Sequence, residues 1–74
     1  MYIIVAVDSR SVGEFYLSDK TRNISRGIIH WECSWANSGT TKVYKNKSNA
    51  EKVMKRLTPL YYKYMTFSVR KIET

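Results

Sequence analysis

Several residue types that mark whole classes of protein are scarce in this chain. Its 74 residues include one cysteine, Cys33, which excludes an internal disulfide framework and any zinc site built from several cysteines. With one proline and three glycines, the composition argues against disorder. No apolar run approaches the ~20 residues that span a bilayer. A glycine-rich phosphate loop and the HExxH and GxSxG motifs are missing, so no metal, cofactor or enzymatic activity is predicted.

Acidic residues are also scarce, and the charge is unevenly distributed. The chain has 13 basic and 6 acidic side chains, for a net charge of +7. Residues 1–36 carry four of each sign, whereas residues 37–74 carry nine basic and two acidic side chains. A concentrated positive field attracts polyanions and speeds association with them. The predicted partner is therefore nucleic acid, or an acidic protein or nucleoprotein surface.

Length and composition otherwise indicate a single folded domain, residues 1–74. Aromatic residues make up 14% of the chain, and each large aromatic side chain buries about 150–250 Å² in a core. The apolar run Tyr2–Val7 has no basic leader and is followed by Asp8, so we expect a strand rather than a signal peptide. A lone cysteine suits the reducing cytoplasm, which is the predicted location.

Alternating hydrophobic patterns predict several short strands. Both faces of Tyr2–Asp8 are apolar, which predicts a central strand. A turn at residues 37–39 is expected to join Ile28–Trp35 to Thr41–Lys45 as a hairpin. The other predicted strands are Glu14–Ser18 and Tyr62–Ile72.

One amphipathic helix is predicted between residues 48 and 58. Ser48 would supply an N-cap hydroxyl, and Glu51, three residues on, would complete a capping box. Pro59 is expected to end the helix, because proline disfavours helical geometry in the residue before it. An apolar stripe follows the i, i+3, i+4, i+7 spacing and consists of Ala50, Val53, Met54 and Leu57.

These elements predict an α+β fold in which one helix covers one face of a small antiparallel sheet. We expect four to five strands in the chain order β-β-β-β-α-β. Trp31 shares a strand face with Cys33 and is expected in the core, while His30 points the other way, which excludes a Cys/His nucleophilic pair. The face opposite the helix would be wet or covered by a partner. Its predicted occupants include Tyr44, Tyr62, Tyr64, His30, Thr66 and Arg70.

Basic residues around the predicted helix form the first candidate site. They could track phosphates, and each neutralised phosphate would release counterions and make binding salt-dependent. The alternative is a solvated helix face, although such faces usually mix both signs. Lys42 and Tyr44 alternate on a predicted strand and need not lie beside the helix. The residues predicted to bind nucleic acid are Lys45, Lys47, Lys52, Lys55 and Arg56.

Three tyrosines form the second candidate site, a protein interface at Tyr44, Tyr62 and Tyr64. Tyrosine suits interfaces because its ring is buried while its hydroxyl stays hydrogen-bonded. The same side chains could instead pack across strands, or stack bases while neighbouring cations hold a nucleic-acid backbone. The residues alone leave these three roles open.

The segment Val43–Leu57, VYKNKSNAEKVMKRL, resembles the short strand, basic turn and AEK–hydrophobic–KRL helix of many small proteins of bacteriophages and mobile elements. The resemblance implies an accessory role in a bacterial host, such as modulating host machinery or blocking a CRISPR nuclease. It supplies no catalytic or binding residues. The predicted function is non-catalytic binding, by occlusion, of nucleic acid or a nucleic-acid-containing host complex. The alternative is a protein–protein inhibitor or assembly factor that uses the tyrosine-bearing face or a strand edge, which could also pair two copies into a homodimer.

Overall fold

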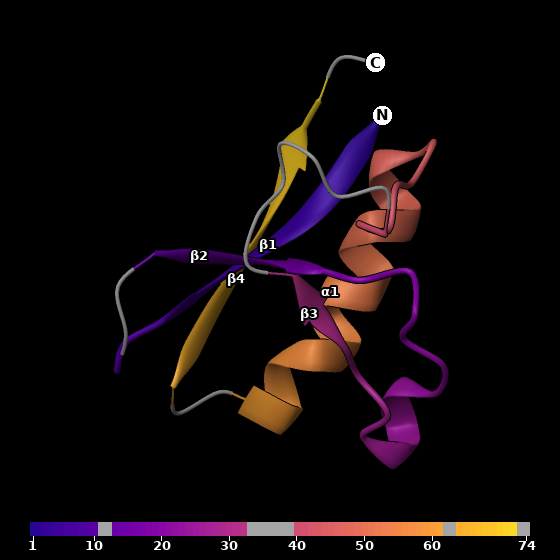
Figure 1. The fold of residues 1–74 in the computed structure, drawn as a ribbon. Helices are drawn as coiled ribbons and strands as arrows, with labels where there is room; N and C mark the ends of the chain where they lie inside the picture. Colours follow the sequence, from indigo (N-terminus) through magenta and orange to yellow (C-terminus); the bar gives the residue numbers. More distant parts are fainter. Residues whose placement is uncertain (11–12, 33–39, 62–63, 73–74) are drawn as a thin grey trace.

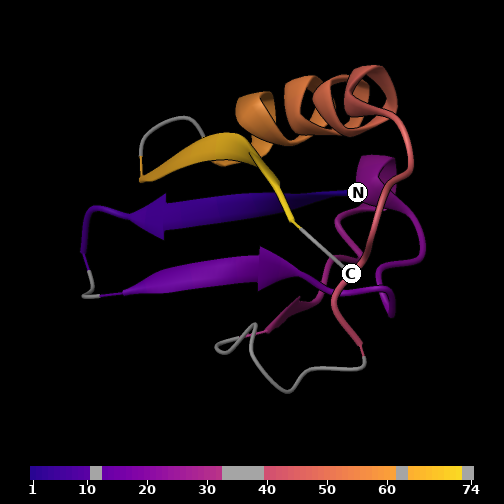
Figure 2. The same cartoon turned by 90° about the horizontal axis from the view of Figure 1, so that it is seen from above.

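Within residues 1–10, 13–32, 40–61 and 64–72, which the computed structural model describes, four strands and one α-helix form. The strands lie in the order β3-β2-β1-β4, and all neighbouring pairs are antiparallel. The helix lies along one side of this sheet (Figures 1 and 2), so the predicted α+β fold is confirmed. The elements are β1 (Tyr2–Asp8), β2 (Glu14–Leu17), the short 3-10 helix η1 (Ile24–Arg26), β3 (Trp31–Glu32), α1 (Lys47–Tyr61) and β4 (Met65–Lys71).

Strand β1 is the centre of the sheet because it is apolar on both faces. It pairs with β2 on one side and with β4 on the other, so that Ala6 lies opposite both Phe15 and Phe67. Residues 3–6 are at most 1% exposed. Burying a large aliphatic side chain to this degree stabilises the fold by about 1.5–3 kcal/mol. The predicted central position of this strand is confirmed.

The main core lies between α1 and the sheet. Ala50 and Leu57 from the helix are fully buried against Ile4 and Leu17 from the strands. Val53 and Met54, the other two residues of the predicted apolar stripe, are half-buried, which confirms the stripe. Trp31 packs against the same cluster, and its ring stacks on Phe67 with 6.0 Å between centroids. Its predicted core position is therefore confirmed, while Cys33 and Trp35 lie outside the described residues.

Both ends of the helix differ from the prediction. The helix begins at Lys47, so Ser48 lies inside the first turn and is not the N-cap. The carbonyl of Asn46 accepts the bond from the Ala50 N–H, which puts Asn46 at the N-cap position. At the other end Pro59 lies inside the helix, which continues to Tyr61. Thr58, the residue before the proline, stays in the helix, and its hydroxyl donates to the Met54 carbonyl at 3.0 Å.

The expected hairpin between Ile28–Trp35 and Thr41–Lys45 is wrong for the described residues. The second segment forms no strand and instead makes isolated bridges, Thr41 with Ser18 and Tyr44 with Tyr2. The Lys42 N–H also donates to the Leu17 carbonyl at 2.8 Å. The segment therefore follows the end of β2 and the start of β1, beside the helix. Of the first segment, only Trp31–Glu32 is a strand, and residues 33–39 lie outside the described residues.

The sheet face turned away from α1 carries a small polar network. Arg70 donates from both terminal nitrogens to the Glu14 carboxylate, and the Tyr16 hydroxyl donates to the same carboxylate at 3.1 Å. The Arg70 guanidinium beside Glu14 lowers the pKa of that carboxyl. Arg70 is exposed, in keeping with the prediction for this face. Tyr44 was predicted here as well, but it packs into the core on the helix side.

Candidate nucleic-acid interface

A groove runs between helix α1 and the extended segment 42–46. Its volume is about 540 Å³, and we call it the basic groove. The helix contributes one wall and the segment contributes the other. The polar side chains that line it are Lys42, Lys45, Asn46, Asn49, Lys52 and Arg56.

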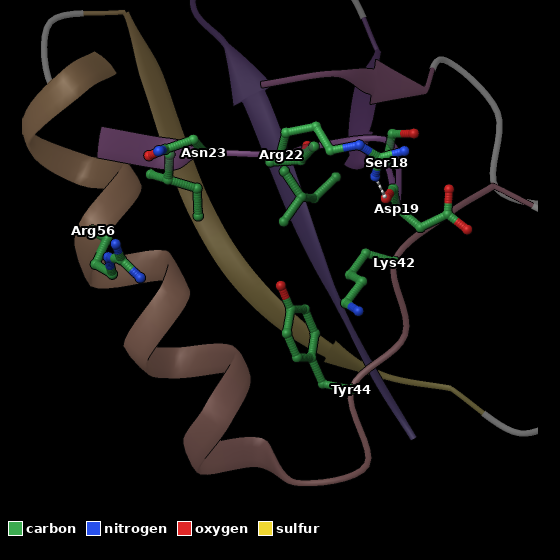
Figure 3. A pocket seen from close by; sticks show the side chains of 10 residues that line it. Ser18, Asp19, Arg22, Asn23, Lys42, Tyr44 and Arg56 are labelled. Atoms are coloured by element: carbon green, nitrogen blue, oxygen red, sulfur yellow. Dashed lines mark hydrogen bonds between the residues drawn. The ribbon is translucent and has the colours of Figure 1, made fainter. Parts of the chain in front are cut away.

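The basic groove continues into a smaller hollow of about 200 Å³, which we call the end cleft (Figure 3). The two hollows share Lys42, Tyr44 and Arg56 in their walls. Beyond these side chains the end cleft is bounded by residues 17–19 and 21–24, which lead from β2 into η1. The groove is therefore open along the helix and bounded at one end by this loop.

On each wall of the groove, the regular spacing of residues along the backbone places the lining side chains on one side. Asn49, Lys52 and Arg56 share a helix flank, because residues three and four apart lie on the same side of a helix. This flank adjoins the buried stripe of α1, which anchors it to the sheet. On the other wall Lys42 and Tyr44 alternate along an extended backbone and so point to the same side. Tyr44 exchanges two backbone hydrogen bonds with Tyr2, both at 2.8 Å, which hold this wall in place.

Among the described residues, the cations of the groove form no ion pair with a carboxylate. The ion pairs formed within the described residues are Arg10–Asp8 and Arg70–Glu14, and neither lies in the groove. The Arg10 guanidinium lowers the pKa of Asp8, as Arg70 does for Glu14. Of the described acidic residues, Asp19 alone lines either hollow, in the end cleft. The concave surface therefore carries a concentrated net positive charge, which suits an anionic ligand.

Tyr44 sits at the junction of the two hollows. Its ring packs against the main core, and burial raises the pKa of its hydroxyl. The hydroxyl is therefore a neutral hydrogen-bond donor at physiological pH, and it points into the end cleft (Figure 3). The Lys42 Nζ lies over the ring, 5.7 Å from its centroid. Such a contact keeps the ammonium group close to the floor of the groove.

Of the five residues predicted to bind nucleic acid, three line the basic groove and two do not. Lys45, Lys52 and Arg56 line the basic groove. Lys47 and Lys55 are exposed on the same helix but line neither hollow. Successive helical residues are rotated by about 100°, so cations that are close in sequence fall on different flanks.

Two further cations, Lys42 and Arg22, join the candidate site. The alternation of Lys42 with Tyr44 is visible in the sequence, but the expected hairpin would have placed both away from the helix. Arg22 comes from the loop before η1, and its Nη1 donates to the Asp19 carbonyl at 3.4 Å. No sequence pattern indicates that this loop reaches the end cleft.

The three predicted interface tyrosines do not form one described surface. Tyr44 bridges to Tyr2 at the start of β1, whereas Tyr64 accepts a bond from the Ser9 N–H just beyond its end. Seven residues of strand separate these positions by about 20 Å. The Arg10 guanidinium covers the Tyr64 ring at 4.0 Å from its centroid. Tyr62 lies outside the described residues.

In comparisons with protein-family models, curated proteins and solved structures, nothing matches this chain. Within the described ranges, no helix is long and apolar enough to cross a membrane. The same ranges hold no group of three or more His, Cys, Asp or Glu side chains that could bind a metal ion. The function is therefore inferred from the shape and charge of the basic groove.

Proposed function

We propose that this protein is a non-catalytic binding protein that holds single-stranded nucleic acid in the basic groove. The observation that carries the proposal is a continuous concave surface lined by Lys42, Lys45, Lys52 and Arg56, none of which has an ion-pair partner in the described structure. Positively charged grooves that follow the backbone are a general solution for binding single strands. The cations come from both walls, so a strand in the groove would be contacted from two sides.

The dimensions favour a single strand over a duplex. The helical wall from Asn49 to Arg56 is about 10 Å long at the usual helical rise. The hollow of about 540 Å³ is the size of a site for a small ligand rather than for a double helix. A duplex would contact the rims of the groove, whereas one strand could enter it and reach all four cations.

The alternative interface of Tyr44, Tyr62 and Tyr64 gains no support from the described residues. Tyr44 is half-buried in the groove, and Tyr64 lies at the other end of the sheet. A role as a phage-type accessory protein in a bacterial cytoplasm, including one that occludes nucleic acid within a host complex, rests on the resemblance of Val43–Leu57. We keep it as the biological setting of the proposal.

Fluorescence anisotropy tests the proposal directly. Labelled single-stranded DNA and RNA, and a duplex of the same length, are titrated with the protein at near-physiological salt. We expect the single strands to bind in the micromolar range or tighter, and more tightly than the duplex. Absence of single-strand binding even at low salt would refute the proposal, and preference for the duplex would refute the role of the groove.

A further inference from the structure

The end cleft differs from the basic groove in ways that point to a particular ligand group. Its volume of about 200 Å³ lies below the range for sites that enclose a complete small molecule, so it suits one end group of a larger ligand. Three cations line it: Arg22 from the loop, Lys42 from the extended segment and Arg56 from the helix. This combination of small size and high positive charge suits a compact anion rather than a nucleobase.

Neutral polar side chains complete the lining of the end cleft. The Tyr44 hydroxyl points into it (Figure 3), and burial raises the pKa of this hydroxyl above its usual value. Asn23 also lines the cleft, and its side-chain oxygen accepts from the Arg26 N–H and the Ser25 hydroxyl. The acidic side chain in this lining, Asp19, turns its carboxylate away from Tyr44 and Arg56 (Figure 3). The cleft thus offers charged and neutral donors to an anion.

The position of the cleft relates it to the groove. Residues 17–19 and 21–24 bound the groove at this end, while Lys42, Tyr44 and Arg56 belong to both hollows. A strand that follows the groove toward the loop would therefore place its end group in the cleft. A terminal phosphate carries about −1.5 to −2 charges near neutral pH, against −1 for an internal phosphodiester, and has three strong acceptor oxygens.

We infer that the end cleft binds the terminal phosphate of a single strand whose internal phosphates lie in the basic groove. This inference rests on the proposed function, and it adds a preference for strands with a phosphorylated end. The geometry does not distinguish a 5′-phosphate from a 3′-phosphate, because both are phosphate monoesters. Both are therefore arms of the test.

The test compares a short labelled oligonucleotide in three forms: with a 5′-phosphate, with a 3′-phosphate, and with hydroxyls at both ends. We expect one phosphorylated form to bind about tenfold more tightly than the hydroxyl form, as charge-assisted hydrogen bonds to a dianion would produce. Arg22→Gln, in the cleft alone, should abolish most of this preference. Tyr44→Phe, which keeps the packed ring and removes only the hydroxyl, should reduce it.

The matched control is Lys45→Gln, which removes a charge from the groove outside the cleft. It should weaken all three oligonucleotides by the same factor and leave the preference intact. Equal binding of the phosphorylated and hydroxyl forms by the wild-type protein would overturn the inference while the proposed function stands. A preference that survives both Arg22→Gln and Tyr44→Phe would place the phosphate elsewhere. If no form binds, the proposed function itself fails.

Discussion

If the basic groove binds the ligand, the loss of affinity on removing cations depends on where those cations lie and not only on how many are removed. Two pairs of cations lie exposed on the same helix: Lys52 and Arg56 line the groove, whereas Lys47 and Lys55 do not. Replacing either pair with alanine lowers the net charge from +7 by the same two units. Alanine is the best helix former, so both double variants should keep the fold. They differ only in where the charge is lost.

The expected magnitude follows from the number of cations in the groove. For single strands, log K falls with log salt by about 0.7 for each neutralised phosphate. If Lys42, Lys45, Lys52 and Arg56 each neutralise one phosphate, the slope is about −2.8, and affinity falls about 50-fold between roughly 50 and 200 mM salt. The groove variant retains two of these contacts, so its slope should be about −1.4 and its loss about sevenfold.

The assay is anisotropy with a labelled single strand at four or more salt concentrations, for the wild-type protein and both double variants. Lys47→Ala with Lys55→Ala removes no groove contact, so its slope should stay at about −2.8, well above the value of about −1.4 in magnitude expected for the groove variant. Circular dichroism and thermal melts confirm that the variants are folded. Equal losses of slope in the two double variants would refute the reasoning, because a diffuse field rather than the groove would then govern binding.

Three further predictions concern stability. Leu57→Ala removes a fully buried side chain from the helix–sheet core and should lower the free energy of unfolding by about 2–5 kcal/mol. Urea titration measures this loss, and a loss within about 0.5 kcal/mol would contradict the burial of this residue. Pro59→Ala adds a backbone N–H at position 59, which can donate to the Lys55 carbonyl as in a regular helix, and should raise the melting temperature. A melting temperature below that of the wild-type protein would show that the helix does not require this hydrogen bond. The folded-state pKa of Glu14 is lowered by Arg70, so its contribution to stability is present above the unfolded value near 4.5 and is lost as the pH falls through the folded value. Glu14→Gln should therefore reduce the acid loss of melting temperature between about pH 6 and pH 2.5, and an unchanged pH profile would exclude this contribution.

The central strand and the helix were predictable from the sequence alone, because the hydrophobic pattern of each shows which of its faces must be buried. The two apolar faces of Tyr2–Asp8 require burial on both sides, which only the centre of the sheet provides. The stripe that includes Ala50 and Leu57 can be buried only by a helix on one face of that sheet. Charge asymmetry likewise indicated that the basic half would carry any polyanion site. Both helix boundary signals, the Ser48 cap and Pro59, failed because each is only a local preference.

Only the tertiary structure decided which cations act together. Backbone pairing of the segment 41–44 with Ser18 and Tyr2, rather than with Ile28–Trp35, placed Lys42 and Tyr44 opposite the helix. That pairing depends on residues far apart in the chain, and the alternating pattern of the segment fits either partner. The same applies to Arg22, which reaches the cleft from a loop without periodicity. The sequence alone thus determined the central strand, the helix and the sign of the charge, while the long-range pairing of one short segment decided the shape of the site.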